Sequence, residues 1–175
     1  RQSKEQSTTN YLVWSGKKWS KIKRVIRHKT HKKMYRVITK TSSVDVTEDH
    51  SLIGEHGNYI KPNECNTTMK LMQSYPKNIN MKYDKKTYDK KLFASKDKAK
   101  CAEYFIVSKG LGYHVQHYYD EDLKMFFMFR TKETIKNPNK VINIIQLDAT
   151  TDNTYVYHLE TEEGTFHAGI GELIV

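Results

Sequence analysis

The stretch Val44-Asp45-Val46-Thr47-Glu48-Asp49-His50-Ser51-Leu52 decides how this sequence is interpreted. Its apolar residues alternate at Val44 and Val46, which predicts a β-strand with one buried face. The pattern stops at Thr47, and His50 follows three residues later. A strand end can place a hydroxyl and an imidazole beside one backbone amide, whose nitrogen the imidazole can protonate. We therefore predict cleavage or rearrangement of a peptide bond, with Thr47 and His50 as candidate catalytic residues.

The composition is strongly basic, and the positive charge is unevenly distributed. The 175 residues carry a formal net charge of +10, and residues 6–44 contain eleven Lys and Arg but no Asp or Glu. One explanation is the solvated face of a basic strand pair. The other is a surface that contacts phosphates, but no arginine fork or aromatic stacking pattern accompanies it. We therefore expect no nucleic-acid partner.

Cysteine spacing and apolar runs narrow the class of protein further. Cys65 and Cys101 have neither metal-ligand spacing nor the spacing of a disulfide framework, so we expect small core residues in a reducing, intracellular compartment. No metal or cofactor is expected. No apolar run approaches the roughly 18 residues of a membrane span, and the polar residues 1–6 do not resemble a signal peptide. We expect no membrane partner.

Residue periodicity predicts a mainly β protein that is interrupted by a small α/β insert. Strands are predicted at residues 11–14, 19–26, 35–39, 44–47, 59–62, 113–119, 123–130, 141–147 and 154–159. Residues 1–10 are expected to form a solvated arm, and residues 28–33 a basic turn. Boundaries near residues 74 and 137 divide the chain into residues 1–74, the insert at residues 75–137, and residues 138–175.

The insert contains the one predicted helix. Ser95 is its expected N-cap, and Gly110 is the expected left-handed residue at its end. Its buried face is expected to contain Ala99, Ala102, Phe105 and Ile106. A hairpin follows, and its second strand, residues 123–130, is apolar on both faces over most of its length. We expect both faces of this strand to be covered.

Three stretches make the sequence resemble an intein, a protein-splicing element of the Hint family. The first runs from Trp19-Ser20-Lys21-Ile22-Lys23-Arg24-Val25-Ile26-Arg27-His28-Lys29-Thr30 into residues 44–52, whose T-x-x-H matches the family's block B. The second stretch resembles the remnant of a homing endonuclease and consists of Lys91-Leu92-Phe93-Ala94-Ser95-Lys96 with Leu111-Gly112-Tyr113. The third, from Tyr155-Val156-Tyr157 to Val175, resembles block F and the strand that leads to the C-terminal splice junction. Similar inteins lie in B-family DNA polymerases of large viruses.

The resemblance implies a mini-intein with the horseshoe-shaped Hint fold. Residues 1–74 and 138–175 would form the splicing domain, and the insert would be an endonuclease remnant without DNA cleavage. Thr47 and His50 would be the two active residues of block B. His158 stands at the block F position that is usually Asp, and we take it as a second proton carrier or an interior histidine. His167 follows Phe166, whereas the family's block F histidine position is Gly164 here, so His167 is a candidate catalytic residue with a structural or surface role as the alternative.

Two family features are absent from the sequence. Family members begin with a Cys or Ser nucleophile and end in His-Asn, whereas this sequence begins with Arg1 and stops at Val175, where His-Asn would begin. One expectation is the larger fragment of a split intein, which would act in trans with a short N-terminal fragment. The other partners implied are the flanking exteins, parts of a B-family DNA polymerase.

Two other functions stay open at this stage. The chain could be a basic DNA-binding module derived from a homing endonuclease, or the autoprocessing domain of another Hint protein. Five histidines show no arrangement with a partner and are expected at the surface: His28, His31, His56, His114 and His117.

Overall fold

The computed structural model describes residues 4–77, 79, 81–148 and 155–175. The strands are Lys4–Ser7 (β1), Leu12–Trp14 (β2), Trp19–Lys29 (β3), Met34–Thr39 (β4), Ser43–Thr47 (β5), Leu52–Ile53 (β6), Tyr59–Ile60 (β7), Leu92–Ser95 (β8), His114–Asp120 (β9), Met125–Thr131 (β10), Val141–Leu147 (β11) and Tyr155–Thr161 (β12). The helices are Lys85–Tyr88 (α1), Lys98–Gly110 (α2) and the 3-10 turn Pro62–Glu64 (η1). The predicted mainly β class is confirmed. The predicted strand at residues 154–159 begins at Thr154, which lies outside the described residues.

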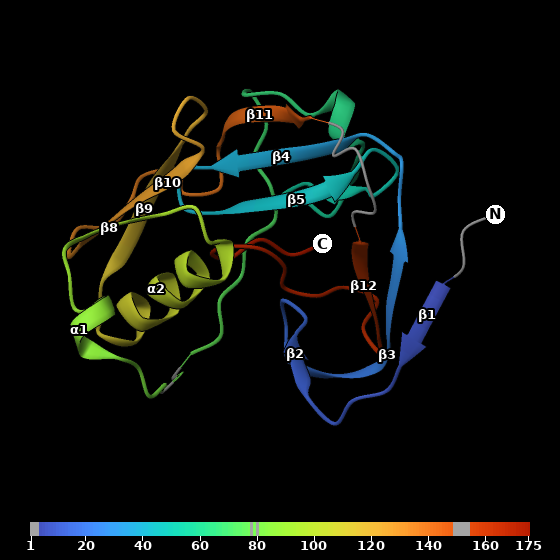
Figure 1. Cartoon of the computed structure of the whole chain (residues 1–175), viewed down its shortest axis with the longest axis horizontal. Helices are drawn as coiled ribbons and strands as arrows, with labels where there is room; N and C mark the ends of the chain where they lie inside the picture. The colour runs from blue at the N-terminus through green and yellow to red at the C-terminus, as the bar shows by residue number, and fades with distance from the viewer. Residues whose placement is uncertain (1–3, 78, 80, 149–154) are drawn as a thin grey trace.

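The long strand β3 organises one side of the molecule. It pairs antiparallel with β1, β2 and β12, and β12 comes from near the other end of the sequence. Figure 1 shows this ladder beside the sheet of β4, β5 and β11, with the C-terminal segment between the two. Strands from near the two ends of the sequence thus pair with the same central strand, β3.

Two expectations about this ladder are wrong. Residues 4–7 form β1 and pair with β3, although they were expected in a solvated arm. The expected basic turn begins later, because His28 and Lys29 continue β3 opposite Val156 and Tyr155. Basic β3 also has acidic partners, since Arg27 Nη2 lies 2.7 Å from Glu5 Oε2.

The first core lies under the sheet of β4, β5 and β11. Val44 and Val46 are buried, while the alternate residues Asp45 and Thr47 lie on the other face of β5, as alternation predicts. The same core includes Leu71, Val141, Phe166, Leu173 and Val175. It therefore joins residues from both sides of the insert.

The insert has its own sheet and contributes most residues of the second core. Strands β8, β10 and β9 form the sheet, and α2 contacts all three strands. On β10, Phe126, Met128 and Arg130 are buried, whereas Phe127 and the other residues of the opposite face are only partly buried. The expectation that both faces are covered is therefore wrong for one face.

Helix α2 begins two residues later than the sequence suggested. Asp97 is the N-cap, because its carboxylate accepts from the N–H of Ala99 at 2.9 Å and from that of Lys100. Ser95 Oγ instead accepts from the Asp97 N–H in the preceding turn, at 3.0 Å. Asp and Ser are equally favourable N-cap residues, so residue type alone does not show which of the two begins the helix.

The end and the buried face of α2 also differ from expectation. Gly112, with φ of 86°, takes the left-handed conformation that Gly110 was expected to adopt. The buried residues of α2 are Cys101, Tyr104, Phe105, Val107 and Ser108. Ala99 is exposed, so the apolar face is rotated relative to the predicted one.

Candidate active site

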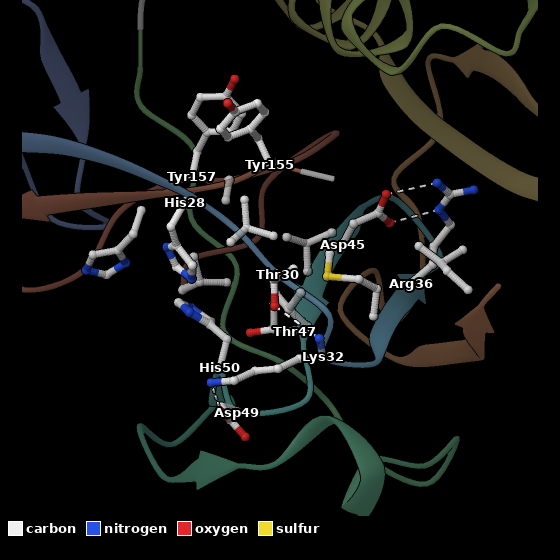
Figure 2. Close-up of a pocket in the computed structure, with 18 of the residues that line it drawn as sticks. His28, Thr30, Lys32, Arg36, Asp45, Thr47, Asp49, His50, Tyr155 and Tyr157 are labelled. Carbon is white, nitrogen blue, oxygen red and sulfur yellow. Dashed lines mark hydrogen bonds and ion pairs between the residues drawn. The ribbon is translucent and has the colours of Figure 1, made fainter. Parts of the chain in front are cut away.

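A cleft of about 870 Å³ lies where β3, β5 and β12 meet the C-terminal segment. Thr47, His50, His158 and Val175 all line it, although they come from distant parts of the sequence. Figure 2 shows the side chains of Thr47 and His50 at the end of β5, and His28 beside them.

The end of β5 positions the first two side chains. The His50 N–H donates to the Thr47 carbonyl at 3.0 Å, which closes a β-turn directly after the strand. The Glu48 N–H donates to the Lys33 carbonyl at 2.8 Å and fixes this turn to the loop after β3. The hydroxyl and the imidazole are therefore held at one strand end.

The C-terminal segment is held in the same place by backbone pairing. The Phe166 N–H donates to the Val175 carbonyl, and the Val175 N–H donates to the Phe166 carbonyl, both at 2.9 Å. Val175 is 8% exposed. Reciprocal bonds of this kind fix a residue in position and orientation, so the wall that Val175 provides is well ordered.

His158 lies close to His50 across the cleft. The centroids of the two imidazoles are 6.1 Å apart, and the His158 ring lies 5.8 Å from the Phe166 ring. Burial lowers the pKa of His50, and charge repulsion with the neighbouring His158 and Lys61 side chains lowers it further. His50 is therefore mainly neutral at neutral pH and able to accept a proton.

His167 does not line the cleft. Its N–H donates to the Trp14 carbonyl at 2.7 Å, and its Nε2 hydrogen-bonds with the Gly171 carbonyl. Burial lowers the pKa of His167, against the opposing effects of that hydrogen bond and of Glu172. The structure thus brings Thr47, His50 and His158 together and leaves His167 behind the terminal segment.

His28 is a cleft residue that was expected at the surface. It is half-buried, and no described residue hydrogen-bonds to its buried Nδ1. Opposite residues of paired strands share a face, and His28 faces Val156 while Ile26 faces His158. His28 and His158 therefore lie on the same side of the ladder. The sequence feature that could have placed His28 in the cleft is its even spacing from Ile22 and Ile26, which puts the three side chains on one face of β3. Which face lines the cleft depends on the register with β12.

A second missed feature is an ion-pair network in the cleft wall. Asp45 accepts from Arg36 at 2.8 and 2.9 Å, and Lys98 Nζ lies 2.8 Å from the same carboxylate. Burial raises the pKa of Asp45, but Arg36 and Lys98 outweigh this effect and lower it overall. Asp45 is therefore charged at neutral pH, two residues before Thr47.

The remaining expectations concern buried groups, metals and membranes. Cys65 and Cys101 are both buried free thiols, as predicted. His117 was expected at the surface, but it is 2% exposed. Across the described ranges, no group of three or more His, Cys, Asp or Glu is arranged to hold a metal ion. None of the described helices is long and apolar enough to cross a membrane.

The chain is similar in sequence to parts of two DNA polymerases. It is 51% identical over 86 residues, 48% of its length, to a DNA polymerase of Acanthamoeba polyphaga mimivirus. It is also 60% identical over 37 residues to a DNA polymerase of Thermococcus sp. (strain GE8). The T-x-x-H strand end and the terminal segment that share the cleft are the features by which the sequence resembles an element inserted in such polymerases. In these features the chain resembles an intein of the Hint family.

The chain corresponds to a small part of the length of the curated relatives that it matches. The matched regions cover 5% of the mimivirus polymerase and 2% of the Thermococcus polymerase. No protein-family model matches the chain. A solved structure described as the transcription factor IIB Mvu mini-intein aligns with 98% of this chain and 75% of that one, at 13% identity and a TM-score of 0.47.

Proposed function

We propose that this chain is an intein that performs autocatalytic protein splicing. The observation that supports the proposal most is the single cleft that contains Thr47, His50 and Val175. A hydroxyl and a largely neutral imidazole beside the C-terminal segment suit a molecule that rearranges its own peptide bonds. Each step of splicing is an acyl transfer or a cyclisation, so placed nucleophiles, acids and bases are its main requirement.

In this proposal His50 moves the proton at the N-terminal junction. The nucleophile at that junction attacks the preceding carbonyl carbon and replaces the amide C–N bond with an ester or thioester bond. His50 takes the proton of the nucleophile and delivers it to the departing amide nitrogen. Its lowered pKa favours the neutral form that starts this transfer. Thr47 hydrogen-bonds to the scissile amide and orients it.

The other two histidines have supporting roles in the proposal. His158, whose ring is 6.1 Å from that of His50, is the second proton carrier. His167 positions the terminal segment, because its imidazole hydrogen-bonds with the Gly171 carbonyl and its N–H with Trp14. The later steps use an Asn that cyclises at the C-terminal junction and a second nucleophile that follows it.

We also propose a domain organisation for the chain. Residues 1–74 and 138–175 form the splicing domain, which the core shared by Val44, Leu71, Val141 and Leu173 supports. Residues 75–137 form an insert that does not cleave DNA. The flanking exteins belong to a DNA polymerase, a proposal that the two matched polymerases support.

The nucleophile segment is proposed to act either in the same chain or in trans as a short fragment. The exposed side chains of Tyr11, Leu12 and Trp19 at and beside β2 provide an apolar surface for such a fragment. An extended peptide could add to a free edge of this ladder through backbone hydrogen bonds. Acidic side chains on the peptide would suit the basic strand β3.

A ligation assay tests the proposal. The chain is fused to two reporters through an N-terminal segment that carries the nucleophile and a C-terminal His-Asn-Ser, and intact mass identifies the ligated reporters. His50→Ala should slow the step at the N-terminal junction by at least about 100-fold, the usual contribution of a general acid–base residue. The matched control is His56→Ala, since the His56 side chain is 87% exposed.

Each outcome of the assay has a distinct meaning. Ligation that depends on His50 but not on His56 supports splicing. Cleavage without ligation contradicts splicing and supports the autoprocessing domain of another Hint protein. An inert fusion that binds DNA in a mobility-shift assay contradicts both and supports the basic binding module.

A further inference from the structure

The insert and the C-terminal segment share one hydrophobic core. Ile170 is 1% exposed and packs in the same cluster as the insert residues Tyr104, Phe105 and Phe126. Val175, five positions later, belongs to the other core and lines the cleft. Ile170 is therefore the point at which the segment that enters the cleft is held by the insert.

An ion pair reinforces this junction. Lys109 Nζ, near the end of α2, lies 3.3 Å from Glu172 Oε1, and the two side chains are only 20% and 16% exposed. The Glu172 N–H donates to Ser42 Oγ at 2.8 Å. A largely shielded charge pair costs more free energy to break than a surface pair. Removing one partner leaves the other as an unpaired charge that water solvates poorly.

The turn between β4 and β5 is held from both sides. On one side, the His117 N–H of the insert donates to the Lys40 carbonyl at 3.1 Å. On the other, Ser43 and Ile170 exchange two backbone hydrogen bonds of 2.9 Å each. The approach is close, because a Cβ on Gly169 would lie 2.2 Å from the Ser43 carbonyl oxygen. Movement of this turn would therefore disturb the insert and the terminal segment together.

The insert also contacts the cleft wall directly. Lys98, at the start of α2, lies 2.8 Å from Asp45, two residues before Thr47. Arg36, the other partner of Asp45, stacks its guanidinium 4.6 Å from the centre of the Tyr119 ring of β9. Figure 2 shows Arg36 and Asp45 joined in the wall of the cleft that contains Thr47.

We propose that the insert is a brace that positions both the C-terminal segment and the β5 wall of the cleft. The positioning residues are Lys109 and His117 of the insert and Ile170 of the terminal segment, and none of the three lines the cleft. Opening the insert must expose Ile170 and release the segment that ends in the cleft. This coupling is a property of the fold, whereas its consequence for splicing, that removing the insert slows the reaction, rests on the proposed function.

Amide hydrogen exchange of the 175-residue chain tests the brace. Phe105→Ala weakens the insert from its own side, and the amides of Phe166, Ala168 and Ile174 report on the terminal segment. We expect these three amides to exchange at least tenfold faster in the variant. The amide of Val25 in β3, a strand paired with β1 and β12, should change by less than about twofold.

A milder set of variants covers the case in which Phe105→Ala fails to fold. Lys109→Met removes the ion pair and should accelerate exchange of the same three amides, whereas Lys109→Arg should restore wild-type exchange. Lys132→Met is the matched control, because Lys132 is an exposed lysine whose hydrogen bond to the Leu111 carbonyl stays within the insert.

The proposal would be overturned if the insert amides, such as that of Met128, exchanged faster in Phe105→Ala while those of the terminal segment did not. It would also be overturned if Lys109→Met and Lys132→Met behaved alike. The ligation assay on the same variants is separate: a wild-type fusion that fails to splice removes the proposed function but leaves the exchange result intact. If wild type splices, the brace requires slower ligation in Lys109→Met and recovery in Lys109→Arg.

Discussion

Mild acid should destabilise this protein through His117. The imidazole is 2% exposed, it stacks on Phe126 with ring centroids 6.1 Å apart, and its Nδ1 lies 3.2 Å from the Lys40 carbonyl. Burial lowers its pKa from 6.5 to about 4, although the hydrogen bond to Lys40 opposes the change. The folded protein therefore keeps His117 neutral at a pH at which the unfolded chain has already bound a proton.

The sign and size of the effect follow from this difference. Above pH 6.5 both states are neutral at this position, so the contribution of His117 to stability does not depend on pH. As the pH falls from 6.5 towards 4, only the unfolded state gains the proton, and the free energy of unfolding decreases. A shift from 6.5 to about 4 corresponds to a loss of about 3 kcal/mol near pH 4.

Urea unfolding at pH 7 and at pH 4 measures this loss. In His117→Phe the loss between the two pH values should be smaller by about 3 kcal/mol than in wild type, because Phe cannot be protonated. His56→Phe is the control and should retain the wild-type pH dependence. Equal losses in wild type and His117→Phe would refute the argument that burial keeps this imidazole neutral.

Three further perturbations have defined outcomes. Asp45→Asn should lower the free energy of unfolding by about 3 kcal/mol, because it breaks a largely buried ion pair. Asp49→Asn breaks an exposed ion pair and should lower it by less than about 1 kcal/mol. Chemical denaturation measures both changes. Gly171→Ala should destabilise more than Gly164→Ala in thermal unfolding: both have positive φ, but an added Cβ meets a serine oxygen at 2.3 Å only at Gly171. Since burial raises the pKa of Cys101 to about 12, iodoacetamide at pH 8 should alkylate it at least about 100-fold faster in denaturant than in the native protein, as followed by mass spectrometry.

The strands that sequence analysis located most accurately are those with local signals. Val44 and Val46 alternate with polar residues, and β5 has that alternation in the structure. The hairpin of β9 and β10 was also predicted, because apolar strand residues flank a short acidic turn. In both cases the information lies within a few neighbouring residues.

The errors about β1, His28 and His117 occur where the contacting residues are distant in sequence. Strand β1 is polar and its four residues are exposed, so its sequence has no hydrophobic period, and only its pairing with β3 makes it a strand. His28 was assigned to a turn because it lies in a basic run, but β12 extends the ladder past it. His117 was expected at the surface, and burial between the insert and the β4–β5 turn could not be predicted from its neighbours.

The sequence by itself determined the mainly β class, the strand end that bears Thr47 and His50, and the resemblance to an intein, because alternation and a short motif are written in adjacent residues. Only the tertiary structure decided that His28 and His158 share a face of one ladder, that Val175 lines the cleft, and that Ile170 joins the core of the insert. The physical reason is strand register. A shift of one residue between β3 and β12 would turn every side chain of β12 to the opposite face, and local sequence patterns do not specify that register.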